Sequence, residues 1–285
     1  LVVHSTVAII RAGNKKCERY HLDRDDILEC CENGYANGFR TFVMQSGENS
    51  CYSDEELCDL IGEIKSIYSD VAVTLSLGER SKESYKMLFD AGADRYLLRH
   101  ETADSEHYAK LHPGSMSFDN RLQCLYNLKE IGYQVGCGFM VGSPYQTADM
   151  IAKDLKFIEE FEPDMCGIGP FIPHRDTPFS TESAGSAELT CYLLSIIRLI
   201  KPNILLPATT ALSSVDDSGY EKGILAGANV VMPNLTPYKE REKYTLYNNK
   251  AISGCDAAES KALLDTRISN IGYEIVTVRG DIKEI

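Results

Sequence analysis

Short β-rich segments alternate with longer helix-like segments along the chain, and this alternation limits the fold more than any other feature. The expected strands cover residues 2–10, 41–45, 72–76, 95–98, 134–140, 165–168, 204–206 and 230–232. The expected helices cover residues 24–35, 54–68, 82–91, 118–131, 148–161, 187–200 and 219–226. Such alternation is typical of parallel strands joined by right-handed helical crossovers. Eight strands of this kind predict an α/β fold, the (β/α)8 TIM barrel.

Glycines recur where these helices end, just before the next strand. They are Gly38, Gly92, Gly132 and Gly227. A glycine there can take the left-handed conformation that closes a helix. The recurrence supports a series of βα units without a linker, so we predict a single domain over residues 1–285. About residues 240–285, with a helix near 257–271 and a strand-like run at 273–278, should form a C-terminal extension packed on the barrel.

The acidic composition excludes several classes of partner. The 285 residues include 29 Lys and Arg against 42 Asp and Glu, a net charge of −13. A surface of this sign binds nucleic acid and anionic membranes poorly. No apolar run approaches the roughly 20 residues of a membrane span, and no signal peptide is visible. We therefore expect a cytoplasmic protein whose partners include neither nucleic acid nor a membrane.

The cysteines are numerous but scattered. The sequence has 10, namely Cys17, Cys30, Cys31, Cys51, Cys58, Cys124, Cys137, Cys166, Cys191 and Cys255. Most lie in apolar segments, and a disulfide scaffold belongs to small secreted domains. We expect reduced thiols that act as small apolar residues.

Polar residues gather where the expected strands end, which is where a TIM barrel carries its active site. They are Gln45, Glu48, Thr74, Arg99, Glu101, Thr209, Thr210 and Asn234. Arg99 and Arg121 can each bind a carboxylate through two hydrogen bonds, and Glu101 can accept from an ammonium or ribose hydroxyls. Alternatively, Arg99 and Glu101 pair with neighbouring helices, and the two threonines cap a helix. His100 points away from Arg99 and Glu101 by strand alternation, which favours a structural role.

Several segments resemble a known family, the radical S-adenosylmethionine (SAM) maturases of FeFe-hydrogenase (HydE type). The matching strings lie at residues 96–103, 117–121, 136–142, 167–174, 207–211 and 227–234. The resemblance implies a complete (β/α)8 barrel that binds SAM and a 4Fe-4S cluster, which cleaves SAM to a 5′-deoxyadenosyl radical. It also implies a role in building the dithiomethylamine bridge of the hydrogenase, with a small-molecule or cysteine-bound iron substrate. Other hydrogenase maturation proteins are the partners it suggests.

The same resemblance assigns roles to individual residues. Those expected to contact SAM, the first three at its methionine amino group, are Ser46, Gly47, Glu48, Arg99, Glu101, Arg121 and Met140. Those expected to line the substrate cavity are Thr74, Ser76, Thr209, Thr210, Met232, Tyr244 and Tyr247.

The chain departs from the family at the iron-sulfur motif. The family carries Cys-x3-Cys-x2-Cys, and registration on Arg11 places the three positions at Leu1, Ser5 and Ala8. A 4Fe-4S cluster that leaves one iron for SAM needs three protein thiolates. No other stretch of the sequence has this spacing. Three explanations stay open: a cluster loop missing from this sequence, a cluster-less relative, or a different register.

Three functions therefore remain as hypotheses. The first is radical SAM chemistry in FeFe-hydrogenase maturation. The second is a carrier that holds SAM, a nucleoside or a metal-complex precursor on the same barrel without cleaving it. The third is a metal-free lyase that uses Glu101 as its base.

Overall fold

A parallel sheet surrounded by helices forms the body of the protein. The computed structural model describes residues 22–46, 52–174, 177–233, 235 and 257–282. The sheet has the order β1-β2-β3-β4-β6, with β1 Thr41–Gln45, β2 Ala72–Ser76, β3 Arg95–Leu97, β4 Gln134–Cys137 and β6 Met165–Cys166. A smaller parallel pair joins β5 Met140–Val141 to β7 Gly169–Pro170. Every pairing between these strands is parallel, as the sequence predicts.

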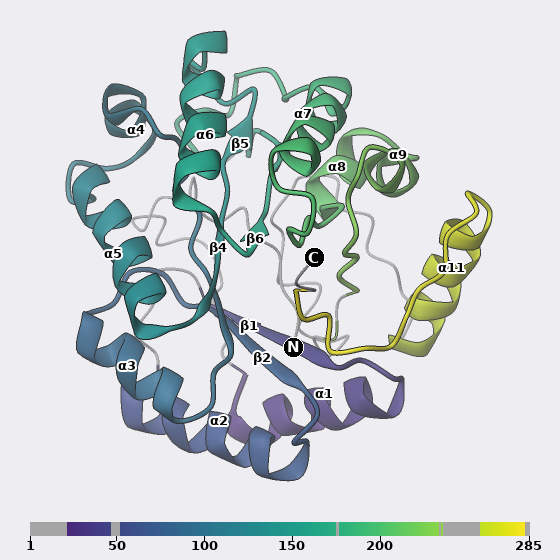
Figure 1. Cartoon of the computed structure of the whole chain (residues 1–285). Coiled ribbons are helices and arrows are strands. Elements are labelled where there is room, and N and C mark those ends of the chain that lie inside the picture. The colour runs from purple at the N-terminus through teal and green to yellow at the C-terminus, as the bar shows by residue number, and fades with distance from the viewer. Residues whose placement is uncertain (1–21, 47–51, 175–176, 234, 236–256, 283–285) are drawn as a thin grey trace.

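The helices lie outside the strands, as Figure 1 shows. They are α1 Arg24–Ala36, α2 Asp54–Ile67, α3 Lys82–Asp90, α4 Ser105–Leu111, α5 Phe118–Ile131, α6 Ala148–Phe161, α7 Ala187–Ile200, α8 Thr210–Val215, α9 Gly219–Leu225 and α11 Ala257–Ser269. None of the described helices is both long and apolar enough to cross a membrane.

Pairing continues beyond β6 through single bridges. Met165 bridges Leu205, and Pro207 bridges Val230. The expected strands at 204–206 and 230–232 thus take their places in the order but are too short to form full ladders. The expected first strand, residues 2–10, lies outside the described residues. The arrangement confirms an α/β fold of the (β/α)8 type.

Local sequence explains where the helices begin and end. Helix α2 starts at a capping box, in which the Ser53 side chain accepts from the Glu56 amide at 3.2 Å and the Glu56 carboxylate accepts from the Ser53 amide at 2.8 Å. The predicted closing glycines have positive φ, at Gly38 (86°), Gly92 (114°), Gly132 (111°) and Gly227 (111°). Because this region is strained for other residues, the glycines allow each turn into the next strand.

Two local predictions are wrong, and one short helix was not predicted. The expected strand 134–140 is broken, because Gly138 turns the chain out of β4 at φ 153° and β5 starts at Met140. Helix α4 is not among the predicted helices, whereas α8 begins at the threonine pair for which a helix cap was one of the alternatives. The run 273–278 forms no strand, since no neighbouring strand pairs with it among the described residues.

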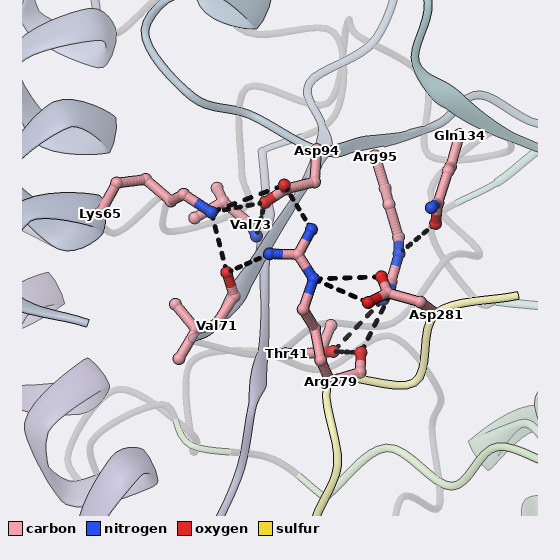
Figure 2. A network of polar contacts seen from close by, with 9 residues as sticks. All are labelled: Thr41, Lys65, Val71, Val73, Asp94, Arg95, Gln134, Arg279 and Asp281. Carbon is pink, nitrogen blue, oxygen red and sulfur yellow. Dashed lines mark hydrogen bonds and ion pairs between the residues drawn. The ribbon is translucent and has the colours of Figure 1, made fainter. Parts of the chain in front are cut away.

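The C-terminal tail attaches to the amino end of the sheet through charged side chains (Figure 2). Arg95, which is 3% exposed, starts β3. Its guanidinium donates to the Arg279 carbonyl at 3.0 Å, to Asp281 at 2.9 Å and to Gln134 at 2.7 Å. Burial lowers the pKa of Arg95, and the hydrogen bond to Asp281 offsets part of that effect. The tail therefore supplies the carboxylate that this buried cation needs.

Asp94 completes this tail network, which we define as Lys65, Asp94, Arg95, Arg279 and Asp281. Its carboxylate accepts from Lys65 at 3.2 Å, from the Val73 amide at 2.8 Å and from Arg279 at 2.6 Å. Arg279 lies between Asp94 and Asp281 (Figure 2). These contacts agree with an extension packed on the barrel, and a single domain over residues 1–285 stays a prediction.

Replacing Asp94 should measurably destabilise the fold. We expect Asp94→Asn to lower the free energy of unfolding by about 1.5 kcal/mol, because it weakens hydrogen bonds to two cationic side chains. Urea denaturation followed by circular dichroism measures the change. Asp90→Asn is the matched control, because its pair with Lys86 is more than half exposed and should contribute no more than about 0.5 kcal/mol. Equal effects of the two variants would contradict the prediction.

Candidate functional site

Two arginines and two glutamates meet beyond the carboxyl ends of β2 and β3. Arg99 and Glu101 follow β3 and are 6% and 5% exposed. Arg121, on the first turn of α5, is 5% exposed, and Glu79 follows β2. Charges are rarely buried without partners, so their placement must be explained by each other or by a ligand.

Arg99 and Glu101 form the first ion pair. Arg99 Nη2 lies 3.5 Å from Glu101 Oε2 in the segment that follows β3. The Glu101 amide donates to the Gly138 carbonyl at 2.9 Å, which ties this turn to the end of β4. Within the described part of the chain, Glu101 Oε2 accepts no hydrogen bond. A buried carboxylate oxygen that accepts no hydrogen bond can accept one from a ligand with an N–H or O–H group.

Arg121 and Glu79 form the second ion pair. Arg121 Nε lies 2.8 Å from Glu79 Oε1, and the Asn120 side chain donates to Glu79 Oε2 at 2.5 Å. The turn that carries Glu79 is fixed because Tyr96 donates its hydroxyl to the Gly78 carbonyl at 2.9 Å. The sequence analysis gives Glu79 no role. The signal for it is its place after β2, equivalent to that of Glu101 after β3.

A stacked tyrosine and histidine stand beside these pairs. The rings of Tyr108 and His112 lie 3.9 Å apart, 14° from parallel. Burial raises the pKa of Tyr108, with smaller effects from Arg121, Glu79 and Glu101. Burial lowers the pKa of His112, while Glu101 opposes that change. Both rings therefore lie within electrostatic range of the buried charges, and sequence reasoning missed both residues.

The hydrogen bond of His112 defines its tautomer. Its Nδ1 lies 3.0 Å from the Tyr108 carbonyl, which can only accept, so Nδ1 carries the proton. Nε2 is then an acceptor, and it is buried without a hydrogen-bond partner among the described residues. The only signal in the sequence is the spacing of four residues, which brings the ring of the C-cap residue His112 back onto that of Tyr108 at the end of α4.

His112 should make stability depend on pH. Its pKa in the folded protein is below the ordinary 6.5, so the unfolded chain takes up the proton first. The stabilisation that His112 gives the folded protein is complete above pH 6.5. As pH falls below that value, the free energy of unfolding decreases by at most about 1.4 kcal/mol per pH unit. We expect His112→Gln to flatten the difference between urea unfolding free energies at pH 7 and pH 5. Parallel curves for the variant and the wild type would contradict this assignment.

Three other predicted residues lie along β1 and β2. The Ser46 amide donates to the Ser76 carbonyl at 3.1 Å, so the two serines stand together where these strands end. Thr74 precedes Ser76 by two residues, on the same face of β2. It is 3% exposed, and its hydroxyl has no hydrogen-bond partner within the described ranges. Their roles in binding stay predictions.

The remaining predicted residues fall into three groups. Thr209 caps α8 by accepting from the Leu212 amide, as the capping alternative expects, and the Thr210 hydroxyl lies 3.2 Å from that of Tyr220. Met140 is buried in an apolar cluster with Phe171, while Met232 is half-buried. Residues that lie outside the described part of the chain are Gly47, Glu48, Tyr244 and Tyr247.

The described residues do not fit an iron-sulfur cluster. The positions registered with the family motif, Leu1, Ser5 and Ala8, lie outside the described ranges, and none is a cysteine. Among the described residues, no group of three His, Cys, Asp or Glu side chains could hold a metal ion. Burial raises the pKa of Cys31 to about 11 and that of Cys137 well above its usual value, so both are neutral thiols and poor ligands.

The buried charges do fit the polar end of SAM. Its methionine part carries a carboxylate that a guanidinium can bind and an ammonium that a carboxylate can accept from. Both partner types stand at this site, and Glu101 keeps an oxygen that accepts nothing within the described residues. Of the two groups that the family implies, SAM is therefore the one that the described residues can hold, whereas they offer no ligand set for the cluster.

Comparisons with known proteins agree with this fold. Residues 8–158 match the family model of the radical SAM superfamily. The chain is 46% identical over 241 residues to the FeFe-hydrogenase maturase subunit HydE of Thermotoga maritima, a match that covers 85% of this chain and 68% of that protein. It is 30% identical to the 3-methylornithine synthase of Methanosarcina acetivorans, covering 75% of this chain and 60% of that protein.

Solved structures give the same architecture. The crystal structure of methylornithine synthase (PylB) superposes with a TM-score of 0.75 at 25% identity and covers 91% of this chain and 75% of that one. The crystal structure of HydG, a maturase of FeFe-hydrogenase, gives a TM-score of 0.70 at 19% identity over 92% of this chain and 59% of that one, which supports the fold alone. Family model and sequence identity together show that this chain belongs to the radical SAM superfamily and, within it, to the HydE-type maturases of FeFe-hydrogenase.

Proposed function

We propose that this chain binds SAM between its two ion pairs, Arg99–Glu101 and Arg121–Glu79, and serves FeFe-hydrogenase maturation as a HydE-type enzyme. The observation that carries the proposal is the burial of Arg99, Glu101 and Arg121 at one end of the sheet, with an oxygen of Glu101 that accepts no hydrogen bond in the described structure. A ligand with both a carboxylate and a donor group would satisfy these residues together.

The two pairs would divide the polar groups of SAM between them. A guanidinium has five donors, so Arg121 can keep Glu79 and bind the SAM carboxylate as well. Glu101 would accept from the ammonium or from ribose hydroxyls, and His112 Nε2 offers a second acceptor nearby. Because these groups are buried, their hydrogen bonds to the ligand would be stronger than in water.

The family's radical chemistry is supplied by a cluster, which gives the electron that cleaves SAM. The described residues do not provide the three thiolates that such a cluster needs. What they would do is bind SAM, fix its orientation and exclude water.

The finer assignments follow from HydE membership. We propose a substrate that is a small molecule or a cysteine-bound iron species, converted in building the dithiomethylamine bridge. Other hydrogenase maturation proteins would be the partners, and the cytoplasm the location. The net charge of −13 disfavours nucleic acid and anionic membranes as competing partners.

Three measurements on the wild-type protein test the function. They are SAM affinity by calorimetry, iron and sulfide content after anaerobic reconstitution, and 5′-deoxyadenosine formation with dithionite. About four irons with deoxyadenosine would support the enzyme. SAM affinity without iron would support the second candidate, a carrier on the same barrel, which the missing cysteine triad favours. The absence of SAM binding would exclude both.

Glu101→Gln separates SAM binding from the metal-free lyase. If Glu101 accepts from SAM, the loss of its charge should weaken SAM binding by about 1.5 kcal/mol or more. If Glu101 is instead the base of a lyase, turnover should disappear while ligand affinity stays close to that of the wild type. Calorimetry of the variant distinguishes the two outcomes.

A further inference from the structure

A buried histidine and a buried aspartate, His100 and Asp154, lie next to the proposed SAM site but on the other side of the chain segment that carries it. His100 lies between Arg99 and Glu101 in sequence, and strand alternation turns it to the opposite side. His100 Nε2 lies 3.2 Å from Asp154 Oδ1, and both side chains are 0% exposed. Asp154 comes from α6, so this contact joins a helix to the segment that carries the proposed SAM-binding residues. Nothing in the proposed binding of SAM uses either side chain.

The neighbouring hydrogen bonds show which atom of the His100–Asp154 pair donates and which accepts. The Gly138 amide donates to His100 Nδ1 at 3.3 Å, so Nδ1 is the acceptor and Nε2 carries the proton that Asp154 accepts. Asp154 Oδ1 also accepts from the Ala103 amide at 2.5 Å. One carboxylate thus holds the chain on both sides of Glu101.

Glu101 has the backbone conformation that needs such support. Its φ is 67°, in the left-handed region that residues with a side chain rarely occupy. Its amide donates to the Gly138 carbonyl at 2.9 Å, so Gly138 is bonded to both His100 and Glu101. A strained residue of this kind persists only where its surroundings fix it.

We propose that the buried His100–Asp154 pair positions Glu101, holding its strained backbone so that the carboxylate meets the ligand. The proposal rests on the proposed function, in which Glu101 binds SAM. His100 and Asp154 are positioning residues, because they reach the ligand through Glu101 and do not contact it themselves.

A double-mutant cycle on SAM affinity tests the proposal. Asp154→Ala removes the acceptor for His100 and Ala103, and we expect SAM to bind at least tenfold more weakly. Asp154→Asn keeps an acceptor oxygen and should stay within threefold of the wild type. In a Glu101→Ala background, Asp154→Ala should cause no further loss, because the residue it positions is gone. Calorimetry with SAM gives all four affinities.

A control variant distinguishes a loss of SAM affinity caused by mispositioning of Glu101 from one caused by lower stability of the fold. Asp94→Asn destabilises the opposite end of the barrel and should lower the melting temperature without changing SAM affinity. If Asp154→Ala fails to fold, His100→Asn, which is too short to reach both Gly138 and Asp154, replaces it under the same criteria.

The outcomes distinguish the two levels of the proposal. If the wild type does not bind SAM, the proposed function fails and the positioning role fails with it. If the wild type binds SAM but Asp154→Ala matches Asp94→Asn, the positioning role alone is wrong. Additive losses in the Glu101→Ala background would also overturn it, because Asp154 would then act independently of Glu101.

Discussion

Gly138→Ala is expected to lower the free energy of unfolding by about 3 kcal/mol or more. A Cβ at this position would lie 2.1 Å from the Gly167 carbonyl oxygen and 2.8 Å from its carbon. These are backbone atoms of the chain leading from β6 to β7, so they cannot move aside as a flexible side chain would. The φ of 153° also disfavours any residue with a Cβ. Urea unfolding measures the loss.

Gly62→Ala provides the matched control for Gly138→Ala. Gly62 lies inside α2, and a Cβ there would meet nothing within 4 Å. Alanine should therefore stabilise the helix by about 0.5–1 kcal/mol. If both variants shifted the unfolding midpoint in the same direction by similar amounts, the close approach at Gly138 would not be the cause.

Arg121→Ala is expected to weaken SAM binding by about 1.5–3 kcal/mol, which is roughly 10-fold to 150-fold in Kd. The variant removes the proposed partner of the SAM carboxylate and leaves the partly buried Glu79 carboxylate without its arginine. That uncompensated carboxylate should repel the SAM carboxylate and add to the loss. Calorimetry measures the affinity, and circular dichroism checks that the variant is folded.

Two further variants sharpen the test of Arg121. Arg121→Lys keeps the charge but cannot bind a carboxylate through a planar fork, so its affinity should lie between those of the wild type and Arg121→Ala. Arg24→Ala removes an arginine that is 54% exposed and paired with Glu63 on the surface, so SAM affinity should be unchanged. An unaltered Kd in Arg121→Ala would remove this residue from the proposed site.

The sequence predicted strand bounds best where the residues at the ends of the strand fix those bounds locally. The expected bounds 41–45 and 72–76 coincide with β1 and β2, because apolar runs there are bordered by turn and capping residues. The break at Gly138 could not be predicted, since the string 136–138 reads as part of an apolar run. Its cause is the Gly167 carbonyl, which only the folded sheet brings close.

The candidate site shows the same division between local and tertiary information. Sequence position places Arg99 and Glu101 after β3, and the structure buries both there. The partner of Arg121 could not be predicted, because Glu79 approaches it from the turn after another strand. The stack of Tyr108 on His112 likewise depends on where α4 packs. The ligand-binding roles of all these residues stay predictions.

The tail network has a consequence for synthesis of the chain. Arg95 lies 184 residues before the Arg279 carbonyl that it binds, and 186 before Asp281. When β1–β4 leave the ribosome, the guanidinium at the start of β3 has neither of these partners. An early half-barrel would therefore have to keep that cation hydrated, and we expect the amino end of the sheet to close after translation has delivered the tail.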